Sequence, residues 1–237
     1  MVAFKQPPKA TVKRETVEQI LYERRLLILV TLFAGVGVFM WLFSLSTDYW
    51  VVIMASDPAG IVLPRANPMG QTYLWSHSGL WRVCLVFNST ESAGAGSAWR
   101  LRTECSYNSF SEDTDIADFE RAELAMCFVV VGLILVAAGF SIYSLIHPRY
   151  TYKRIAAALH LLTALCLVAL IEMVKSTPHL TQHDIQGVVL ENSVVFYGYS
   201  YLMAWVVFII FVISSIAFFV GSRKRKNLPC DFETALI

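Results

Sequence analysis

The chain has 237 residues, of which 56% are hydrophobic and 16% are charged, and its mean hydropathy is +0.55. This apolar share exceeds that of ordinary soluble domains, so the composition argues against a soluble globular protein. The formal net charge of +1 offers no general positive excess for binding nucleic acid, and no nucleic-acid partner is expected. The composition indicates a chain whose solvent is largely lipid.

Four long apolar runs can each cross a hydrocarbon core about 30 Å thick as a helix. They occupy residues 26–46, 124–146, 155–174 and 201–221. The first run is longer than the apolar part of a signal peptide and no small-residue cleavage site follows it, so it is expected to be retained. In the second run, Gly132 and Gly139 offer places where a neighbouring helix could approach closely. The fold class predicted is an all-α membrane protein with a four-helix transmembrane bundle.

Basic residues are divided unevenly between the segments that alternate across the membrane. Most lie in the N-terminal segment (residues 1–25), in the short connection after residue 146, and in the tail (residues 223–237), which begins with the run Arg-Lys-Arg-Lys. Lys and Arg are retained on the cytoplasmic side. Both termini are therefore predicted to be cytoplasmic, and residues 47–123 and 175–200 are predicted to be outer loops.

The first outer loop contains two features typical of the side that is oxidising and glycosylating. Asn88-Ser89-Thr90 is a glycosylation sequon, with Asn88 as the acceptor. Cys84 and Cys105 lie in the same loop, where a disulfide between them would contribute about 3 kcal/mol in the chain-entropy model. Both features agree with the orientation that the basic residues indicate.

Short apolar stretches in this loop, for example residues 50–54 and 79–87, alternate with turn-forming residues. Such a pattern, closed by a disulfide, predicts a small extracellular antiparallel β-sheet. A sheet this small needs an apolar surface to pack on. The helix ends, with Trp50, Trp75 and Trp81, are expected to supply it.

An ordered set of residues resembles the W…GLWxxC…C pattern of the claudin superfamily. Its members are Trp50, Gly79, Leu80, Trp81, Cys84 and Cys105. Within the superfamily, residues 76–82, the acidic run 110–123 and the stretch Tyr197-Gly198-Tyr199-Ser200 are most similar to the stargazin-like calcium-channel gamma subunits. The resemblance covers roughly residues 26–222.

The chain also departs from that pattern. The gap between Cys84 and Cys105 is longer than in ordinary claudins, and the outer loop lacks the second cysteine pair of many stargazin relatives. Two residues before the end stands Ala235, where a PDZ ligand normally has Ser or Thr, so a PDZ scaffold is not an expected partner. Cys230 follows the basic run, and both a palmitoylated and a free thiol fit its position.

The resemblance implies a non-enzymatic auxiliary subunit in the plasma membrane. Its partner would be the pore subunit of a voltage-gated calcium channel or an AMPA-type glutamate receptor, and it would alter gating or trafficking. A claudin-like junction or adhesion protein is the alternative. The residues predicted to dock the partner are Glu112, Asp113, Asp115 and Asp118, although a merely solvated acidic face remains open, and small residues of the third helix, Ala156, Ala157 and Ala164.

Nothing in the sequence predicts catalysis, a metal site or a cofactor. The histidines are scattered, and no Cys or His spacing resembles a zinc site. His179 and His183 are expected to be solvated. His160 and Glu172 are the ionisable side chains within the third run, and both are interpreted as structural, with Glu172 paired to Lys175.

Overall fold

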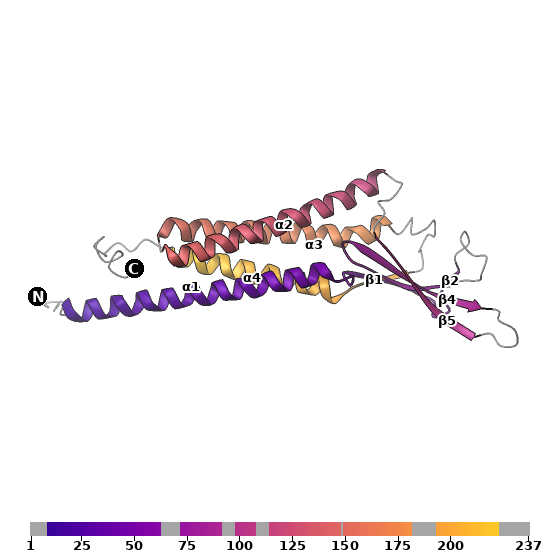
Figure 1. Cartoon of the computed structure of the whole chain (residues 1–237), viewed down its shortest axis with the longest axis horizontal. Helices are drawn as coiled ribbons and strands as arrows, with labels where there is room; N and C mark the ends of the chain where they lie inside the picture. The colour runs from indigo at the N-terminus through magenta and orange to yellow at the C-terminus, as the bar shows by residue number, and fades with distance from the viewer. Residues whose placement is uncertain are drawn as a thin grey trace, which may run out of the picture. The chain divides into compact units, whose positions relative to one another are not determined.

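The computed structural model describes residues 9–62, 72–91, 98–107, 114–147, 149–181 and 193–222. Within these residues the chain forms four helices and six strands (Figure 1). The helices are α1 (Lys9–Ser46), α2 (Thr114–Ile146), α3 (Tyr150–Thr181) and α4 (Tyr199–Val220). The strands are β1 (Val51–Ala55), β2 (Ile61–Val62), β3 (Thr72–Ser78), β4 (Arg82–Glu91), β5 (Ala98–Tyr107) and β6 (Ser193–Tyr197).

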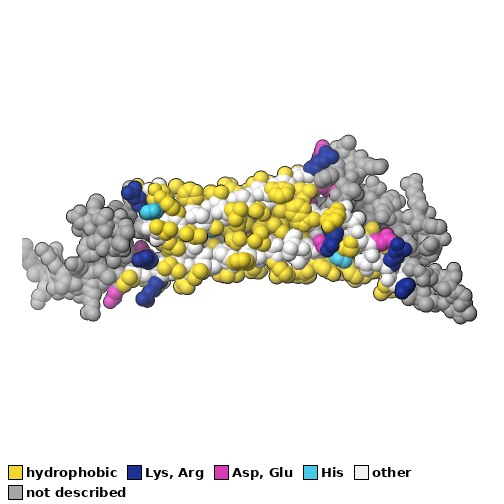
Figure 2. Space-filling model, in the orientation of Figure 1, with side chains coloured by type: hydrophobic (Ala, Val, Ile, Leu, Met, Phe, Trp, Pro, Cys, Tyr) yellow, Lys and Arg dark blue, Asp and Glu magenta, His cyan; other side chains and the backbone are white. Residues whose placement is uncertain are grey.

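Each helix contains an apolar stretch long enough to cross a bilayer. These stretches are Leu21–Ser46, Asp118–Ile146, Tyr150–Thr177 and Tyr199–Val220. Less than half of each most apolar window is buried inside the protein, so large apolar side chains such as Phe39 (75% exposed) face outward. Figure 2 shows this apolar surface, with Lys and Arg gathered towards its ends. Lipid is the solvent that fits such a surface, and the predicted multi-pass membrane protein with four spans is confirmed.

The chain divides into two compact units, and each helix contributes to both. Unit 1 consists of Met1–Val36, Leu133–Thr163 and Ile210–Ile237. Its core contains Leu27 and Val30 of α1, Ala156 and Ala157 of α3, and Phe218 of α4. The alanines let the neighbouring helix backbones approach, and the Ser215 hydroxyl of α4 donates to the Ala157 carbonyl at 2.9 Å.

The alanines predicted to face a partner are therefore used within the bundle. Ala156, Ala157 and Ala164 are 0%, 3% and 1% exposed. The prediction that they dock another protein was wrong, because small size is equally suited to packing inside one chain as between two. The opposite holds on α2, where an added Cβ at Gly132 or Gly139 would meet no atom within 4 Å.

His160 lies fully buried in unit 1 and connects two helices. Its Nε2 is 2.8 Å from the Ser141 hydroxyl of α2, and its ring contacts Phe211 and Phe218 of α4 at centroid distances of 5.4 and 5.5 Å. Ser141 already donates its single proton to the Ala137 carbonyl at 2.8 Å. The Nε2–H of a neutral imidazole must therefore be the donor to Ser141, which supports the structural interpretation of His160.

Replacing Ser141 tests this connection. Ser141→Ala leaves the buried Nε2–H of His160 without its acceptor, and should lower the free energy of unfolding in detergent by about 1 kcal/mol. Ser144→Ala is the control, since Ser144 is equally buried on α2 but donates only to the Ser141 carbonyl of its own helix. Equal destabilisation by both variants, measured by thermal or denaturant unfolding, would contradict the assignment.

Unit 2 consists of Gly37–Gly132 and Ala164–Ile209 and contains the whole sheet. The strand order is β5-β4-β3-β1-β6, with β2 paired to β3, and every pairing is antiparallel. The sheet between α1 and α2 confirms the prediction for the first outer loop. The sequence did not predict β6, which comes from the segment between α3 and α4 and pairs with β1.

Buried side chains lie on both faces of the sheet, with Cys84 and Val86 on one face and a larger apolar set on the other. Val51, Ile53, Leu85 and Phe87 are each less than 9% exposed. Tyr73 lies among them, and its hydroxyl donates to the Ile53 carbonyl at 2.9 Å. Burial raises the pKa of Tyr73 to about 12, so the phenol stays neutral and able to donate. This side-chain hydrogen bond joins β3 to β1 in addition to the backbone hydrogen bonds between the two strands.

Candidate partner-binding site

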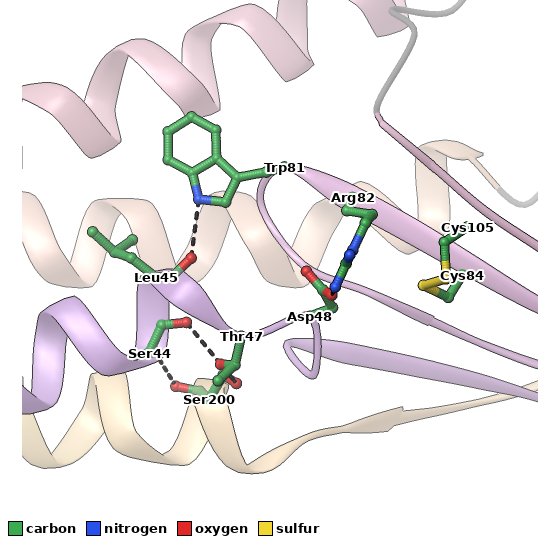
Figure 3. A network of polar contacts seen from close by, with 9 residues as sticks. All are labelled: Ser44, Leu45, Thr47, Asp48, Trp81, Arg82, Cys84, Cys105 and Ser200. Carbon is green, nitrogen blue, oxygen red and sulfur yellow. Dashed lines mark hydrogen bonds and ion pairs between the residues drawn. A yellow bond between two sulfur atoms is a disulfide. The ribbon is translucent and has the colours of Figure 1, made fainter.

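Figure 3 shows the end of α1 with Trp81 directed at it from the turn before β4, and with Cys84 and Cys105 further along the sheet. Helix α1 stops at Ser46, so its last four carbonyls have no amide donor within the helix. The Ser46 and Thr47 hydroxyls donate to the Phe43 and Ser44 carbonyls at 2.7 and 2.9 Å, and two indole groups supply further donors. Trp50 Nε1 donates to the Ser44 carbonyl at 2.9 Å, and Trp81 Nε1 donates to the Leu45 carbonyl at 3.0 Å. Both tryptophans of the pattern therefore cap the same helix.

The tryptophan rings also bury apolar surface at this junction. Trp50 is 1% exposed and meets Trp41 of α1 edge to face at 6.0 Å. Trp81 meets Phe128 of α2 in a similar arrangement at 5.8 Å. Leu80, between β3 and β4, is 3% exposed. The predicted apolar support of the sheet is thus built from the ends of α1 and α2.

Gly79 allows the turn between β3 and β4 to touch the chain after α1. A Cβ at this position would lie 2.8 Å from both the Asp48 Cα and the Thr47 carbonyl oxygen, which no real side chain tolerates. In the same turn the Arg82 guanidinium forms an ion pair with the Asp48 carboxylate. Hydrogen bonding to Asp48 raises the pKa of Arg82, although the exposed guanidinium limits what the pair adds to stability.

Helix α4 joins the junction through the stretch Tyr197-Gly198-Tyr199-Ser200. The Gly198 amide donates to the Trp50 carbonyl at 3.0 Å, and the Ser200 amide donates to the Tyr49 carbonyl at 3.3 Å. The Ser44 hydroxyl donates to the Ser200 carbonyl at 2.8 Å. At Gly198 a Cβ would collide with the Tyr49 backbone. The second matching stretch thus fixes the start of α4 to the end of α1.

His77 of β3 lies within an aromatic stack beside this junction. Its ring is parallel to that of Tyr49 at 4.5 Å and tilted against Trp75 at 5.2 Å, while Tyr49 also stacks on Tyr199. Burial lowers the pKa of His77, with Asp48 acting to raise it and Arg82 to lower it. The folded protein therefore favours the neutral ring.

Cys84 and Cys105 form a disulfide that joins β4 to β5, where the two residues lie directly opposite in the register. The predicted pair is therefore present. Of the remaining cysteines in the described part of the chain, Cys127 is buried and Cys166 is half-buried, as expected for small apolar residues within helices. Cys230 lies outside the described residues.

The residues predicted to dock a partner are largely outside the described part of the chain. Glu112 and Asp113 lie outside it, and the side chain of Asp115 in α2 is not described. Asp118 is exposed and forms an ion pair with Arg121 at 3.1 Å, which offsets part of its charge. Docking by this acidic run remains a prediction.

Two acidic side chains near the ends of the spans have local partners. Glu123 of α2 accepts a hydrogen bond from the Thr177 hydroxyl of α3 at 2.9 Å. Glu172 lies 3.3 Å from Lys175, which is the predicted pair one turn apart on α3. Both contacts account for the carboxylates through structure and require no transported ion.

Asn88, the predicted glycan acceptor, lies on β4 between Thr72 of β3 and Leu101 of β5. It is half-buried, and glycosylation at this position remains a prediction. No group of three or more His, Cys, Asp or Glu side chains in the described ranges could hold a metal ion. The side chain of His179 is not described, and His183 lies outside those ranges.

The indole caps can be tested by single substitutions. Trp50→Phe and Trp81→Phe keep an aromatic ring but remove the N–H, and each should lower the free energy of unfolding by about 1 kcal/mol or more. Trp50→Phe should cost less than Trp81→Phe, because the Ser44 carbonyl keeps the Thr47 hydroxyl as a donor at 2.9 Å. Trp205→Phe is the control, since the Trp205 ring packs against Phe208 within α4. Melting in detergent provides the measurement, and a loss in Trp205→Phe equal to the other two would refute the capping role.

The buried His77 predicts a pH dependence. The unfolded chain takes up a proton on this side chain below about pH 6.5, whereas the folded chain resists it. Stability should therefore fall as the pH is lowered from about 7.5 to about 5, and His77→Phe should lose part of that dependence. Thermal unfolding across this range measures the effect. Parallel pH profiles for the wild type and His77→Phe would exclude a contribution from His77.

These elements define a class of protein: four membrane-crossing helices, with a disulfide-closed antiparallel sheet fixed to the ends of α1 and α4. Residues 35–220 match the family described as PMP-22/EMP/MP20/Claudin tight junction, and this match covers most of the chain. The chain belongs to that family. The resemblance that the tryptophans, the glycine and the cysteines indicated is therefore confirmed.

Curated relatives of this chain include two calcium-channel gamma subunits. The voltage-dependent calcium channel gamma-7 subunit of Homo sapiens is 30% identical over 126 residues, which are 53% of this chain and 43% of the relative. The gamma-5 subunit of Mus musculus is 27% identical over 127 residues, with the same two shares. The matched stretch thus spans less than half the length of these relatives.

Proposed function

We propose that this protein is a non-enzymatic auxiliary subunit that binds the pore subunit of an ion channel in the same membrane and alters its gating or surface level. The similarity to the gamma-7 and gamma-5 subunits carries the proposal, because both are named as subunits of voltage-dependent calcium channels. A voltage-gated calcium channel is therefore the first candidate partner. An AMPA-type glutamate receptor, which the resemblance to stargazin implies, is the second.

The junction between the sheet and the helices supports this function physically. A subunit that alters gating through a contact outside the membrane needs a rigid connection between the contacting surface and its membrane-spanning helices. Without it, the contact would favour no particular arrangement of those helices. Here the sheet is joined to α1 by two indole caps and to α4 by backbone hydrogen bonds. A contact on the sheet would therefore act on two spans together.

Within the membrane, α2 offers a surface for a partner helix. Gly132 and Gly139 are seven residues apart on one helix, so they lie close to the same face, and no described atom outside the backbone of α2 lies within 4 Å of a Cβ at either position. Small residues of this kind allow helices from different proteins to pack closely in lipid. This face replaces the buried alanines of α3 in the proposed contact.

Adhesion between cells is the second candidate, and the edge strand β6 favours it. Val194 and Phe196 are 46% and 51% exposed, and their partners on β1, Met54 and Val52, lie on the same side of the sheet. An exposed apolar edge is suited to pairing with another protein. The opposite edge, β5, instead carries the ion pair between Arg102 and Glu104.

Co-expression distinguishes the two candidates. Together with a voltage-gated calcium channel or an AMPA-type receptor, the protein should change gating kinetics or surface level, and alone it should produce no current. Glu112→Gln, Asp113→Asn and Asp115→Asn combined should weaken the modulation without lowering surface delivery, because they remove the charge that would attract a partner and keep the size of each side chain. Glu104→Gln, which neutralises an exposed acid on β5, is the control.

Two results would overturn parts of this proposal. Unchanged modulation in the triple variant would make the acidic run a solvated face. An absence of any effect on either channel, together with accumulation at cell contacts, would favour the adhesive function instead.

The proposed orientation places both termini in the cytoplasm and the sheet outside the cell, as the distribution of Lys and Arg indicates. An epitope at either terminus should then bind antibody only after permeabilisation. Glycosidase should shift the mobility of the wild type and leave Asn88→Gln unchanged. Labelling of a terminal epitope on intact cells would reverse the orientation.

A further inference from the structure

Basic residues occur in two parts of unit 1, near the start of the apolar stretch of α1 and around the start of α3. They are Arg24 and Arg25 of α1, Arg149 just before α3, and Lys153 and Arg154 in the first turns of α3, and together they form the basic cluster. Four of the five are exposed, and Lys153 is half-buried. These residues come from two separate parts of the sequence.

Packing brings these two parts to the same level. Leu27 of α1, one turn after Arg24, shares a core with Ala156 and Ala157 of α3, which lie one turn after Lys153. Lys153 also reaches α4, because its Nζ donates to the Gly221 carbonyl at 3.5 Å. The two parts of the basic cluster therefore lie at one level of unit 1, on helices that pack together.

Aromatic side chains indicate the depth of this surface in the bilayer. Tyr143 of α2 meets Tyr152 of α3 edge to face at 4.8 Å, and the Arg154 guanidinium lies 5.7 Å from the Tyr150 ring centre. Tyrosines favour the level of the lipid head groups. The Arg154 guanidinium beside Tyr150 is therefore expected at the level of the lipid phosphates.

Five basic residues stand against two acidic ones, Glu18 and Glu23, in the described part of α1 and α3 near this level. Retention of Lys and Arg on the cytoplasmic side explains their sign. That retention does not require basic residues of two packed helices to lie at one level beside tyrosines. Arginines arranged in this way are suited to bind several phosphate oxygens at once.

We propose that the basic cluster binds the head group of a polyphosphorylated inositol lipid in the membrane leaflet that it faces. Several ring phosphates on one head group can meet cations from both α1 and α3, whereas a lipid with a single charge neutralises one cation at a time. This inference is independent of the channel-subunit function. Its failure would leave that function untouched.

Lipid titration of the full-length protein, followed by native mass spectrometry, tests the proposal. Phosphatidylinositol bisphosphate should bind more tightly than phosphatidylserine supplied at matched total charge. Arg149→Gln, Lys153→Gln and Arg154→Gln combined should weaken bisphosphate binding on the order of 100-fold, from about fivefold per cation. Arg100→Gln, Arg102→Gln and Arg121→Gln combined is the control, because it removes the same charge from the unit that contains the sheet.

Further measurements keep the result decisive. Arg154→Gln alone, which removes an exposed guanidinium, should still fold and should weaken binding about fivefold. The proposal is overturned if the wild type does not prefer bisphosphate to serine lipid, or if both triple variants lose affinity equally. It is also overturned if soluble inositol trisphosphate binds as tightly as the lipid, since the ligand would then be a free phosphate.

Discussion

The last carbonyls of α1 need hydrogen-bond donors that the helix itself cannot provide. At a membrane surface, water supplies such donors incompletely, and a helix end buried against other elements must find them in the protein. The indoles of Trp50 and Trp81 serve α1, one from the chain just after the helix and one from the turn between β3 and β4. These hydrogen bonds to the last carbonyls therefore fix the position of the sheet relative to the end of α1.

The same requirement gives a physical meaning to residues of the family pattern. Each tryptophan contributes both a donor and a large apolar surface, which phenylalanine or tyrosine could not match at the same position. Gly79 is required because the backbone of residues 47 and 48 occupies the space of a side chain. Deeper in lipid, the hydrogen bond between His160 and Ser141 meets a similar need between α2 and α3. In both places a polar group can lie among apolar side chains because the fold places its hydrogen-bond partner beside it.

The sequence predicted the four spans, the sheet and its disulfide because each depends on short-range information. An apolar run long enough to cross lipid has few alternatives, and Cys84 and Cys105 were the cysteines predicted to lie on one side of the membrane within one loop. The pairing of β6 with β1 could not be predicted, since four other strands and the helices α2 and α3 lie between these two strands in the sequence. A short run of β-branched and aromatic residues at 194–197 was the available signal. The use of Ala156 and Ala157 within the bundle was also hidden, because small residues favour close packing without specifying the neighbour.

The position of the disulfide has a practical consequence. Cys84 and Cys105 join β4 to β5 near the ends of these strands that adjoin the junction, so the disulfide holds the register of the two strands whatever the length of the connection at residues 92–97. A change of length in that connection would add loop entropy that grows only slowly with residue number. The hydrogen bonds described for the indole caps and the start of α4 are made by other residues. The connection is accordingly the place at which a reporter peptide could be inserted with least disturbance to the attachment of the sheet.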